Sequence, residues 1–532
     1  MEPVQDEPVA VEESPPPVAA DQPQQQRAAQ HEQETTFTIT EFKVEGNTIF
    51  TSERLLLLLD DFIGPRKTAG DVEKARETLE KFYHDEGYPS VIANIPEQKV
   101  EEGIVRLQLI ESKISATRLT GNRHFSTAQI MDKLPSLAPG TVIYAPDVEK
   151  EIGRVNRNQD LKVVPSAMTP GKDLGTIEVD LKAEDHLPFH GSIEVSNRSA
   201  HDTTPLRINM GAHYDNLWGL EHSLSLQYQF SPQKFNEVEV VSASYMLPAP
   251  WYRDSNIVVY GVYSNSNTRF GDSFNTLGKG DVIGVRYVFS FTPYKSFTST
   301  AILGFDYKNF DESTSQGTSQ AVTSPVEYMP LSLVYSGSLL DSTGTTLFNV
   351  GFNMAFRGLI AREQAFDDKR FKARSNYFYA ALGVERRQKL PYGAGLNVKL
   401  DGQIADQPLI SNEQYAAGGM DNVRGYKDSE IMGDSAFHGM IELVSPNLAP
   451  NVGLSERFLI TPYIFYDFAV VMVKDPLPGQ DNVMDLEGGG FGIRGALFKD
   501  LEFQADCALA LTDTQKIKKW DNRIYFKVKY LF

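Results

Sequence analysis

The sequence has no apolar run long enough to form a membrane-spanning helix, and it has only one cysteine. Its longest purely aliphatic stretch, Leu55–Leu59, is far shorter than the roughly 18 to 20 residues that such a helix needs. The mean hydropathy of -0.31 is also too low for a bundle of membrane helices. The single thiol, Cys507, excludes an intrachain disulfide framework and any metal site built from several cysteines.

Positive charge and tryptophan are scarce as well. The chain has 51 Lys and Arg against 70 Asp and Glu, so its formal net charge is -19. Nucleic-acid binding requires clustered basic residues, and the sequence has no such run. There are only 3 Trp but 23 Tyr and 31 Phe. An excess of Tyr and Phe suits the aromatic girdles of an outer-membrane β-barrel, although other β-rich proteins also show it.

Residues 1–36 contain almost no periodic apolar positions and include Pro15–Pro17 and Gln24–Gln26. This composition predicts a flexible tail. The prolines also oppose an amphipathic helix in this segment. No cationic region followed by an apolar stretch opens the sequence, so no signal peptide is visible. If the chain is a barrel protein, we therefore expect that this sequence is the mature form or that its first residue is assigned at the wrong place.

The order strand, helix, helix, strand, strand is predicted twice, over residues 37–112 and over residues 113–186. The first strand of each copy ends in a similar turn, Glu45-Gly46-Asn47 in one and Thr120-Gly121-Asn122 in the other. Two copies at a spacing of about 75 residues indicate an internal repeat. The alternative is a single α+β domain with an accidental similarity.

From residue 187 to residue 532, apolar and polar residues alternate. For example, Leu224, Leu226, Tyr228 and Phe230 alternate with Ser and Gln. This period of two predicts strands. A soluble sandwich also alternates, but it rarely has so many polar residues on its inner face. We count about sixteen strands, which suits an outer-membrane barrel. The predicted fold class is therefore α+β repeats followed by an all-β transmembrane barrel of about 16 antiparallel strands.

The predicted connections alternate in length, as the short inner turns and long outer loops of such a barrel do. One inner connection, 446–457, is longer than this rule allows. The longest outer loop spans residues 405–435. The other predicted inner turns and outer loops are 215–219, 292–295, 390–393 and 498–500 inside, and 269–281 and 310–326 outside.

The longest outer loop contains Val423-Arg424-Gly425-Tyr426, shortly after Gly418. A glycine-rich segment can enter a crowded barrel lumen because glycine adopts conformations that other residues avoid. An arginine in that position offers a planar fork of donors and needs a fixed carboxylate. An ordinary surface turn is the alternative explanation.

A candidate carboxylate lies in a later strand. Because Ile464 and Tyr466 belong to the lipid-facing phase of that strand, Phe465 and Asp467 are predicted to point into the lumen. Asp467 could instead be a solvated lumen charge.

Two small repeats before a long β-region resemble the POTRA domains of two-partner secretion transporters, and the segments 155–158 and 169–171 are also similar to that family. The loop motif and the Phe-x-Asp motif resemble those of the wider BamA/TpsB superfamily. Within it, the chain resembles the TpsB transporters, which form the haemolysin/filamentous haemagglutinin secretion-activation family. The resemblance implies a loop-to-barrel lock in which the loop folds into the lumen. Its residues are Val423, Arg424, Gly425, Tyr426, Phe465 and Asp467.

The last strand places Ile524, Phe526, Val528, Tyr530 and Phe532 on one face. A chain that ends in an aromatic residue on such a strand resembles the recognition signal of outer-membrane barrels. The resemblance therefore assigns Tyr530 and Phe532 to barrel insertion.

No catalytic set, metal site or cofactor site is predicted. None of the nine His pairs with another His or Glu at the helical spacing of metal ligands. The predicted lumen carboxylates Asp401 and Asp506 suggest a surface protease or phospholipase, but such barrels are smaller and lack periplasmic repeats. Cys507 is predicted to be a small lipid-facing residue.

The resemblance implies an outer-membrane transporter of Gram-negative bacteria that exports a large unfolded β-helical exoprotein, of the adhesin or haemolysin type, without ATP. Its POTRA domains would lie in the periplasm and capture the exported chain. Implied partners are the exoprotein, outer-membrane lipid, the barrel assembly machinery and periplasmic chaperones, with no nucleic acid and with the chain a monomer. An outer-membrane insertase of the same superfamily is an alternative, although it typically carries three or more POTRA domains. A passive pore is the other alternative.

Overall fold

The computed structural model describes residues 35–201, 203–235, 237–252, 254–266, 278–314, 322–455 and 457–532. The segment predicted to be a flexible tail, 1–36, lies outside the described residues except for its last two. The chain divides into two compact units. The first comprises the chain up to Thr120, Lys133–Val155 and Val163–Lys182, and the second Gly121–Asp132, Asn156–Lys162 and Ala183–Phe532.

The first copy of the repeat contains the predicted elements, with the first predicted strand divided into two at Thr40, and one additional strand. Its elements are β1 (Phe37–Ile39), β2 (Glu41–Glu45), α1 (Ser52–Leu56), the 3-10 turn η1 (Asp60–Phe62), β3 (Gly64–Lys67), α2 (Ala69–Asp85), β4 (Val91–Asn94) and β5 (Ile104–Glu111). The main sheet has the order β2-β5-β4, and β3 pairs with β1. The prediction missed β3 because Gly-Pro-Arg-Lys shows no alternation of apolar and polar residues.

Helix α2 shows how the local sequence sets an element of this copy. A capping box between Thr68 and Asp71 begins the helix. Val72 and Leu79, seven residues apart and therefore on the same face of the helix, are buried against the sheet. Gly87 follows the end of the helix with a φ of 98°, a left-handed conformation that glycine adopts at little cost.

The second copy repeats the order of the first. Its elements are β6 (Lys113–Thr120), α3 (Thr127–Asp132), the 3-10 turn η2 (Pro135–Leu137), α4 (Ala145–Val155), β7 (Leu161–Pro170) and β8 (Thr176–Asp185), and its sheet has the order β6-β8-β7. None of the helices in the described ranges is both long and apolar enough to cross a bilayer.

The two copies share the chemistry of one turn as well as the order of their elements. Gly46 and Gly121 have φ values of 87° and 95°. A Cβ at either position would lie 2.2 or 2.3 Å from a carbonyl oxygen of the facing strand, so only glycine fits. The next residues, Asn47 and Asn122, each donate a hydrogen bond to the carbonyl three residues ahead, at 2.9 and 2.8 Å. The same backbone constraint therefore recurs in both copies.

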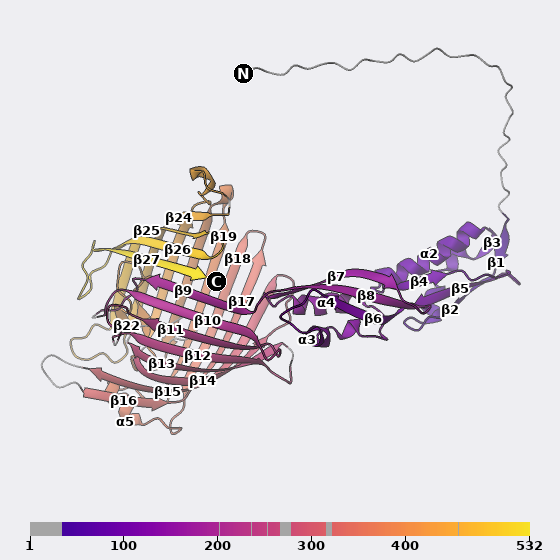
Figure 1. The fold of residues 1–532 in the computed structure, drawn as a ribbon. Helices are drawn as coiled ribbons and strands as arrows, with labels where there is room; N and C mark the ends of the chain where they lie inside the picture. Colours follow the sequence, from indigo (N-terminus) through magenta and orange to yellow (C-terminus); the bar gives the residue numbers. More distant parts are fainter. Residues whose placement is uncertain are drawn as a thin grey trace, which may run out of the picture. The chain divides into compact units, whose positions relative to one another are not determined.

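A closed antiparallel barrel dominates the second unit (Figure 1). Its strands are β9 (Phe189–Ser196), β10 (Arg207–Leu217), β11 (His222–Phe230), β12 (Glu239–Pro248), β13 (Ser255–Ser266), β14 (Gly278–Ser290), β15 (Phe297–Thr314), β16 (Val322–Tyr328), β17 (Pro330–Asp341), β18 (Gly344–Ala355), β19 (Phe378–Lys389), β20 (Gly395–Ala405), β23 (Ser435–Val444), β24 (Leu459–Met472), β25 (Val483–Leu497), β26 (Leu501–Ala510) and β27 (Asn522–Leu531).

The barrel has the predicted sixteen strands, because β16 and β17 both pair with β15 and are interrupted only at Met329. Strand β27 pairs with β9 and closes the barrel. Phe532 continues this ladder, since its N–H donates to Gly191 at 3.0 Å and its carbonyl accepts from Gly191 at 2.7 Å. The even count thus returns the C-terminus to the end at which the chain enters β9.

The described connections follow the predicted alternation, with two differences. Most of the predicted outer loop 269–281 lies outside the described residues, and its last residues, 278–281, belong to β14. The predicted outer loop 310–326 is strand wherever it is described, because β15 extends to Thr314 and β16 begins at Val322, whereas residues 315–321 lie outside the described residues. Its polar residues predicted a loop, but a hairpin beyond the bilayer needs no apolar face. A short helix, α5 (Glu363–Lys369), also lies between β18 and β19. The long inner connection occurs as predicted, between Val444 and Leu459.

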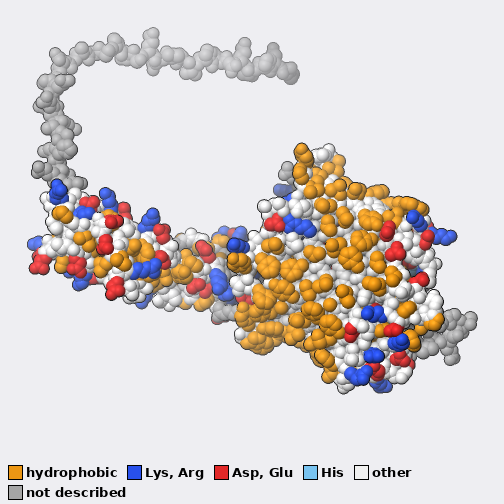
Figure 2. Space-filling model, turned by 180° about the vertical axis from the view of Figure 1, so that it is seen from behind, with side chains coloured by type: hydrophobic (Ala, Val, Ile, Leu, Met, Phe, Trp, Pro, Cys, Tyr) orange, Lys and Arg blue, Asp and Glu red, His pale blue; other side chains and the backbone are white. Residues whose placement is uncertain are grey.

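The outer wall of the barrel is apolar. Figure 2 shows a broad band of hydrophobic side chains over the strands. Leu224 and Leu226 on β11 are exposed, whereas Ser223 is buried, so the predicted lipid-facing phase is confirmed. The inner connections also carry exposed aromatic residues suited to a membrane interface. These are Trp218, Trp251, Tyr294, Tyr392 and Phe498.

A charge on this wall should destabilise the barrel, whereas the same charge in the lumen should not. Leu226→Arg near the middle of β11 should cost about 2–4 kcal/mol, because arginine must leave water for lipid. Gln227→Arg, one residue further and on the lumen side, is the matched control. Urea unfolding in lipid vesicles measures both variants. Equal destabilisation by the two would contradict the assigned phase.

Candidate functional site

The loop between β20 and β23 brings its central residues into the barrel. It contains a small hairpin of β21 (Tyr415–Ala417) and β22 (Ile431–Gly433). Between these strands, the side chains of Val423, Arg424 and Tyr426 are almost completely buried. Their contacts are with the lumen-facing residues of the strands β23 to β27, so the barrel wall surrounds this part of the loop.

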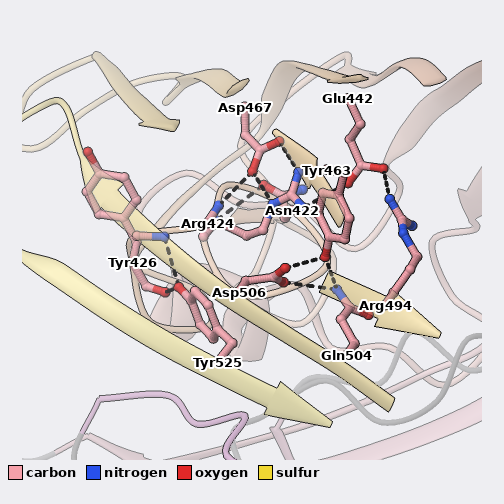
Figure 3. A network of polar contacts seen from close by, with 12 residues as sticks. Asn422, Arg424, Tyr426, Glu442, Tyr463, Asp467, Arg494, Gln504, Asp506 and Tyr525 are labelled. Atoms are coloured by element: carbon pink, nitrogen blue, oxygen red, sulfur yellow. Dashed lines mark hydrogen bonds and ion pairs between the residues drawn. The ribbon is translucent and has the colours of Figure 1, made fainter. Parts of the chain in front are cut away.

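Arg424 and Asp467 form a buried ion pair with two parallel hydrogen bonds (Figure 3). The Nε and Nη2 groups of Arg424 each donate to one carboxylate oxygen of Asp467, both at 2.7 Å. The backbone N–H of Arg424 donates to the same carboxylate at 3.1 Å. Asp467 is 0% exposed and Arg424 is 2% exposed. The carboxylate thus holds the side chain and the backbone of the loop at once.

A second carboxylate and an aromatic ring complete the surroundings of Arg424. Its Nη1 donates to Glu442 on β23 at 2.8 Å. The guanidinium carbon lies 3.5 Å from the ring centroid of Phe465, a cation–π contact. Glu442 also pairs with Arg494 on β25. Two cations and two anions therefore balance, which makes the burial of Arg424, Asp467 and Glu442 tolerable, while Arg494 is partly exposed.

A tyrosine network extends from this cluster along the barrel wall (Figure 3). Tyr463 donates to Asp506, and Gln504 donates to the same carboxylate at 2.9 Å. The guanidinium of Arg494 lies over the ring of Tyr463 at 4.0 Å. On the other side of the loop, the hydroxyl of Tyr525 accepts from the backbone N–H of Gly425 at 3.0 Å. Strands β24, β26 and β27 thus all contribute to the site.

Glycine in the barrel wall makes room for the loop. A Cβ on Gly488 of β25 would lie 1.8 Å from the carbonyl oxygen of Arg424. Gly488 is also the residue paired with Asp467 in the antiparallel register. On the loop, Gly425 has a φ of 107°, and a Cβ there would lie 2.9 Å from the backbone of β26. The close approach of two backbones therefore requires glycine on both.

The base of the loop is held by a different set of contacts. Glu413 is 5% exposed and accepts hydrogen bonds from Lys308 at 2.7 Å, from Tyr379 at 2.9 Å and from Tyr328. On the far side of the hairpin, Arg198 donates to Asp428 at 3.0 Å. The loop is thus attached to the wall at several points along its length.

A polar cavity of about 460 Å³ lies beside Arg424. Charges of both signs line it, including Arg387, Lys399, Asp421 and Arg494. Its lining is mixed, since Met420, Met440 and Val444 lie among the charged and amide side chains.

The structure brings together the six residues assigned to the loop and its partner strand. Tyr426 contacts the carbonyl oxygens of Glu487 and Thr512 at 2.9 and 2.8 Å. Tyr530 and Phe532 lie apart from this site and are exposed on the apolar face of β27, with stacked rings 6.0 Å apart. Cys507 lies in the same phase of β26 as the exposed Leu509.

The sequence prediction missed Glu442, Tyr463, Arg494 and Tyr525 as parts of the site. Glu442 could have been found, because it lies in the lumen-facing phase of the strand directly after the loop. The tyrosines gave no comparable signal, since Tyr and Phe occur in both phases of many strands. Asp506 was considered for catalysis, but its carboxylate is engaged by Tyr463 and Gln504.

Comparisons with known proteins agree with this architecture. A family model described as haemolysin secretion/activation protein ShlB/FhaC/HecB matches residues 175–495, and a model of the ShlB-type POTRA domain matches residues 37–112. The heme/hemopexin transporter protein HuxB of Haemophilus influenzae (strain 86-028NP) is 22% identical over 82% of this chain and 77% of its own length. The outer membrane transporter CdiB of Dickeya dadantii (strain 3937) is 22% identical over 77% of this chain and 73% of its own.

Solved structures show the same fold. CdiB from Escherichia coli matches with a TM-score of 0.63 at 16% identity, covering 95% of this chain and 92% of that one. BamA from Haemophilus ducreyi lacking POTRA domains 1–3 matches with a TM-score of 0.57 at 15% identity, covering 93% and 100%. At these identities the likeness shows the fold alone.

The glycine at the loop contact provides a sharp test of the geometry. Gly488→Ala should displace the loop, because its methyl group would overlap the carbonyl of Arg424. Overpacking of this kind commonly costs about 1–3 kcal/mol. The readout is thiol labelling of a cysteine introduced by Met420→Cys, at a buried loop position, in a Cys507→Ala background. Gly488→Ala should raise the labelling rate ~10-fold.

Gly489→Ala is the matched control. A Cβ at Gly489 would lie 3.5 Å from Leu511, an ordinary van der Waals contact. Labelling should therefore stay at the parent rate. The same rate in both glycine variants would show that the close contact at Gly488 does not hold the loop.

Proposed function

We propose, for a chain that belongs to the haemolysin secretion/activation protein family ShlB/FhaC/HecB, that the loop carrying Arg424 forms a lock on which export depends. The family's members are outer-membrane transporters for exoproteins that leave the cell by two-partner secretion. This chain has the barrel and the periplasmic POTRA architecture of such a transporter. It therefore exports an exoprotein across the outer membrane.

The exported chain is proposed to be a large, unfolded, β-helical protein of the adhesin or haemolysin type, moved without ATP and without a cofactor. HuxB and CdiB, which the chain resembles, are named as transporters. The proposed division of the chain is a tail at 1–36, POTRA domains at 37–112 and 113–186, and a barrel at 187–532 with the inward loop at 405–435.

The lock consists of Val423, Arg424, Gly425, Tyr426, Phe465 and Asp467, and the ion pair between Arg424 and Asp467 is the observation that carries the proposal. Removing one partner of a buried pair leaves the other charge unpaired, which commonly costs about 3–5 kcal/mol. The docked loop therefore has one strongly preferred position. Because the loop occupies the lumen, an exported chain can pass only when the loop moves aside.

Insertion of the barrel is proposed to use the exposed aromatic residues Tyr530 and Phe532 of the last strand. The partners in that step are the barrel assembly machinery, periplasmic chaperones and outer-membrane lipid. The transporter is proposed to act as a monomer, since the barrel closes within one chain. A net charge of -19 opposes a nucleic-acid partner.

Two other functions are less well supported. An insertase of the same superfamily would share the barrel, as the likeness to BamA shows for the fold, but the match to the secretion family and the two POTRA-like repeats favour export. A passive pore would not need a buried ion pair that anchors a loop in the lumen. The family consists of transporters, and we propose that this chain has no enzymatic activity.

Arginine substitution tests the lock. Arg424→Ala should reduce secretion of the partner exoprotein by at least roughly tenfold, because it leaves Asp467 without its buried partner and Glu442 with Arg494 alone. Secretion is measured by immunoblotting of the culture medium, with barrel insertion checked by heat-modifiable electrophoresis.

Arg387→Ala is the control, since Arg387 is an exposed arginine of the lumen that pairs with Glu385. Secretion of the exoprotein by this variant should match secretion by the parent. Unchanged secretion in Arg424→Ala, with the barrel inserted, would refute the lock.

A further inference from the structure

A second cluster of polar side chains lies on the lumen side of the first two barrel strands, away from the loop. His190 on β9 and His213 on β10 are directly opposite each other in the antiparallel register. Asp215 follows His213 by two residues and so shares its face. Met210, in the alternate phase of β10, is exposed on the outer wall. The three residues therefore point into the barrel near the end at which the chain enters.

The cluster has the ligand set and the spacing of a metal site. One ring nitrogen of each histidine and one carboxylate oxygen of Asp215 all lie within 4.8 Å of one another. His213 Nε2 and Asp215 Oδ2 are 3.4 Å apart. A tetrahedral zinc ion with bonds of about 2.0–2.2 Å holds its ligands about 3.4 Å apart. One pair already has this spacing, and the third ligand atom lies within 4.8 Å of both.

The surroundings of the cluster orient its members as the neighbours of metal ligands do. Asp160, with a side chain only 5% exposed, lies 3.0 Å from Nε2 of His190. Ser223 donates to the other carboxylate oxygen of Asp215. A carboxylate behind a histidine fixes the ring and raises the basicity of the nitrogen that faces the ion.

The charges also favour a cation. The two imidazole rings are stacked, with centroids 4.8 Å apart and an angle of 28° between their planes. Asp160 and Asp215 bring two carboxylates to the cluster. A divalent cation would balance them, and the partial exposure of both histidines gives an ion access.

We propose that His190, His213 and Asp215 bind a divalent transition-metal ion of the zinc class, with water completing the coordination. Two imidazoles and one carboxylate, with an open position, are ligands that zinc accepts. Asp160 is a positioning residue that acts through His190. The ion joins β9 to β10 and, through Asp160, to the segment Asn156–Lys162. It thereby stiffens the entry end of the barrel.

The test uses the full-length protein in detergent, freed of metal with a chelator and titrated with ZnCl2 by calorimetry. One ion per chain should bind, with a dissociation constant in the micromolar range or tighter. Zinc should also raise the melting temperature, because a ligand that binds only the folded state stabilises it. His190→Gln and His213→Gln should remove both effects. Asp160→Asn should weaken binding about 10- to 100-fold.

His84→Gln is the control, because His84 lies on α2, away from the cluster, and its ring contacts only a backbone carbonyl among the contacts described. It should bind zinc as the parent does. Cobalt absorption of the unaltered protein gives a measurement that needs no variant, since tetrahedral coordination produces strong visible bands. No zinc binding below millimolar concentration by the parent would overturn the proposal. So would undiminished binding by folded His213→Gln.

Discussion

The barrel must accommodate a buried arginine, and much of its local sequence follows from that one group. Arg424 is held by Asp467, by Glu442 and by the face of Phe465. An unpaired guanidinium in such a place would be very costly, so each of these contacts is needed to offset its desolvation. Arg494 then balances the second carboxylate. The result is a neutral cluster that fixes one position of the loop.

The period of two along a strand makes this arrangement possible. In β24, Phe465 and Asp467 face the lumen, while Ile464 and Tyr466, which alternate with them, are exposed on the outer wall. One strand can therefore contribute to a polar site and to an apolar surface with no conflict. The same rule places glycine at position 488 opposite Asp467, where the loop backbone comes too close for a side chain. The site is thus distributed over strands that are far apart in sequence and adjacent in the barrel.

The sequence predicted those parts of the structure that depend on local patterns. Alternation predicted the sixteen strands, and the repeated Gly-Asn turn predicted the two copies of the N-terminal unit. It did not predict β3 (Gly64–Lys67), which has no alternation and exists only because β1 pairs with it. The outer strand segments at 310–314 and 322–326 were missed for a similar reason, since strands outside a bilayer need no apolar face.

Side-chain partners were predictable only where a motif named them. Arg424 and Asp467 belong to motifs, whereas the contacts of Tyr463 and Tyr525 arise from the closure of the barrel. His190 and His213 are a further pair of neighbours that no motif predicts. They lie too far apart in sequence for a helical spacing rule, and the register of β9 with β10 makes them neighbours.

A double-mutant cycle on Arg424 and Asp467 tests the central claim most directly, with labelling at Met420→Cys, in the Cys507→Ala background, as the readout. The account predicts that Arg424→Ala and Asp467→Ala each raise the labelling rate and that the double variant labels hardly faster than either. Fully additive effects, or unchanged labelling in the single variants, would contradict it.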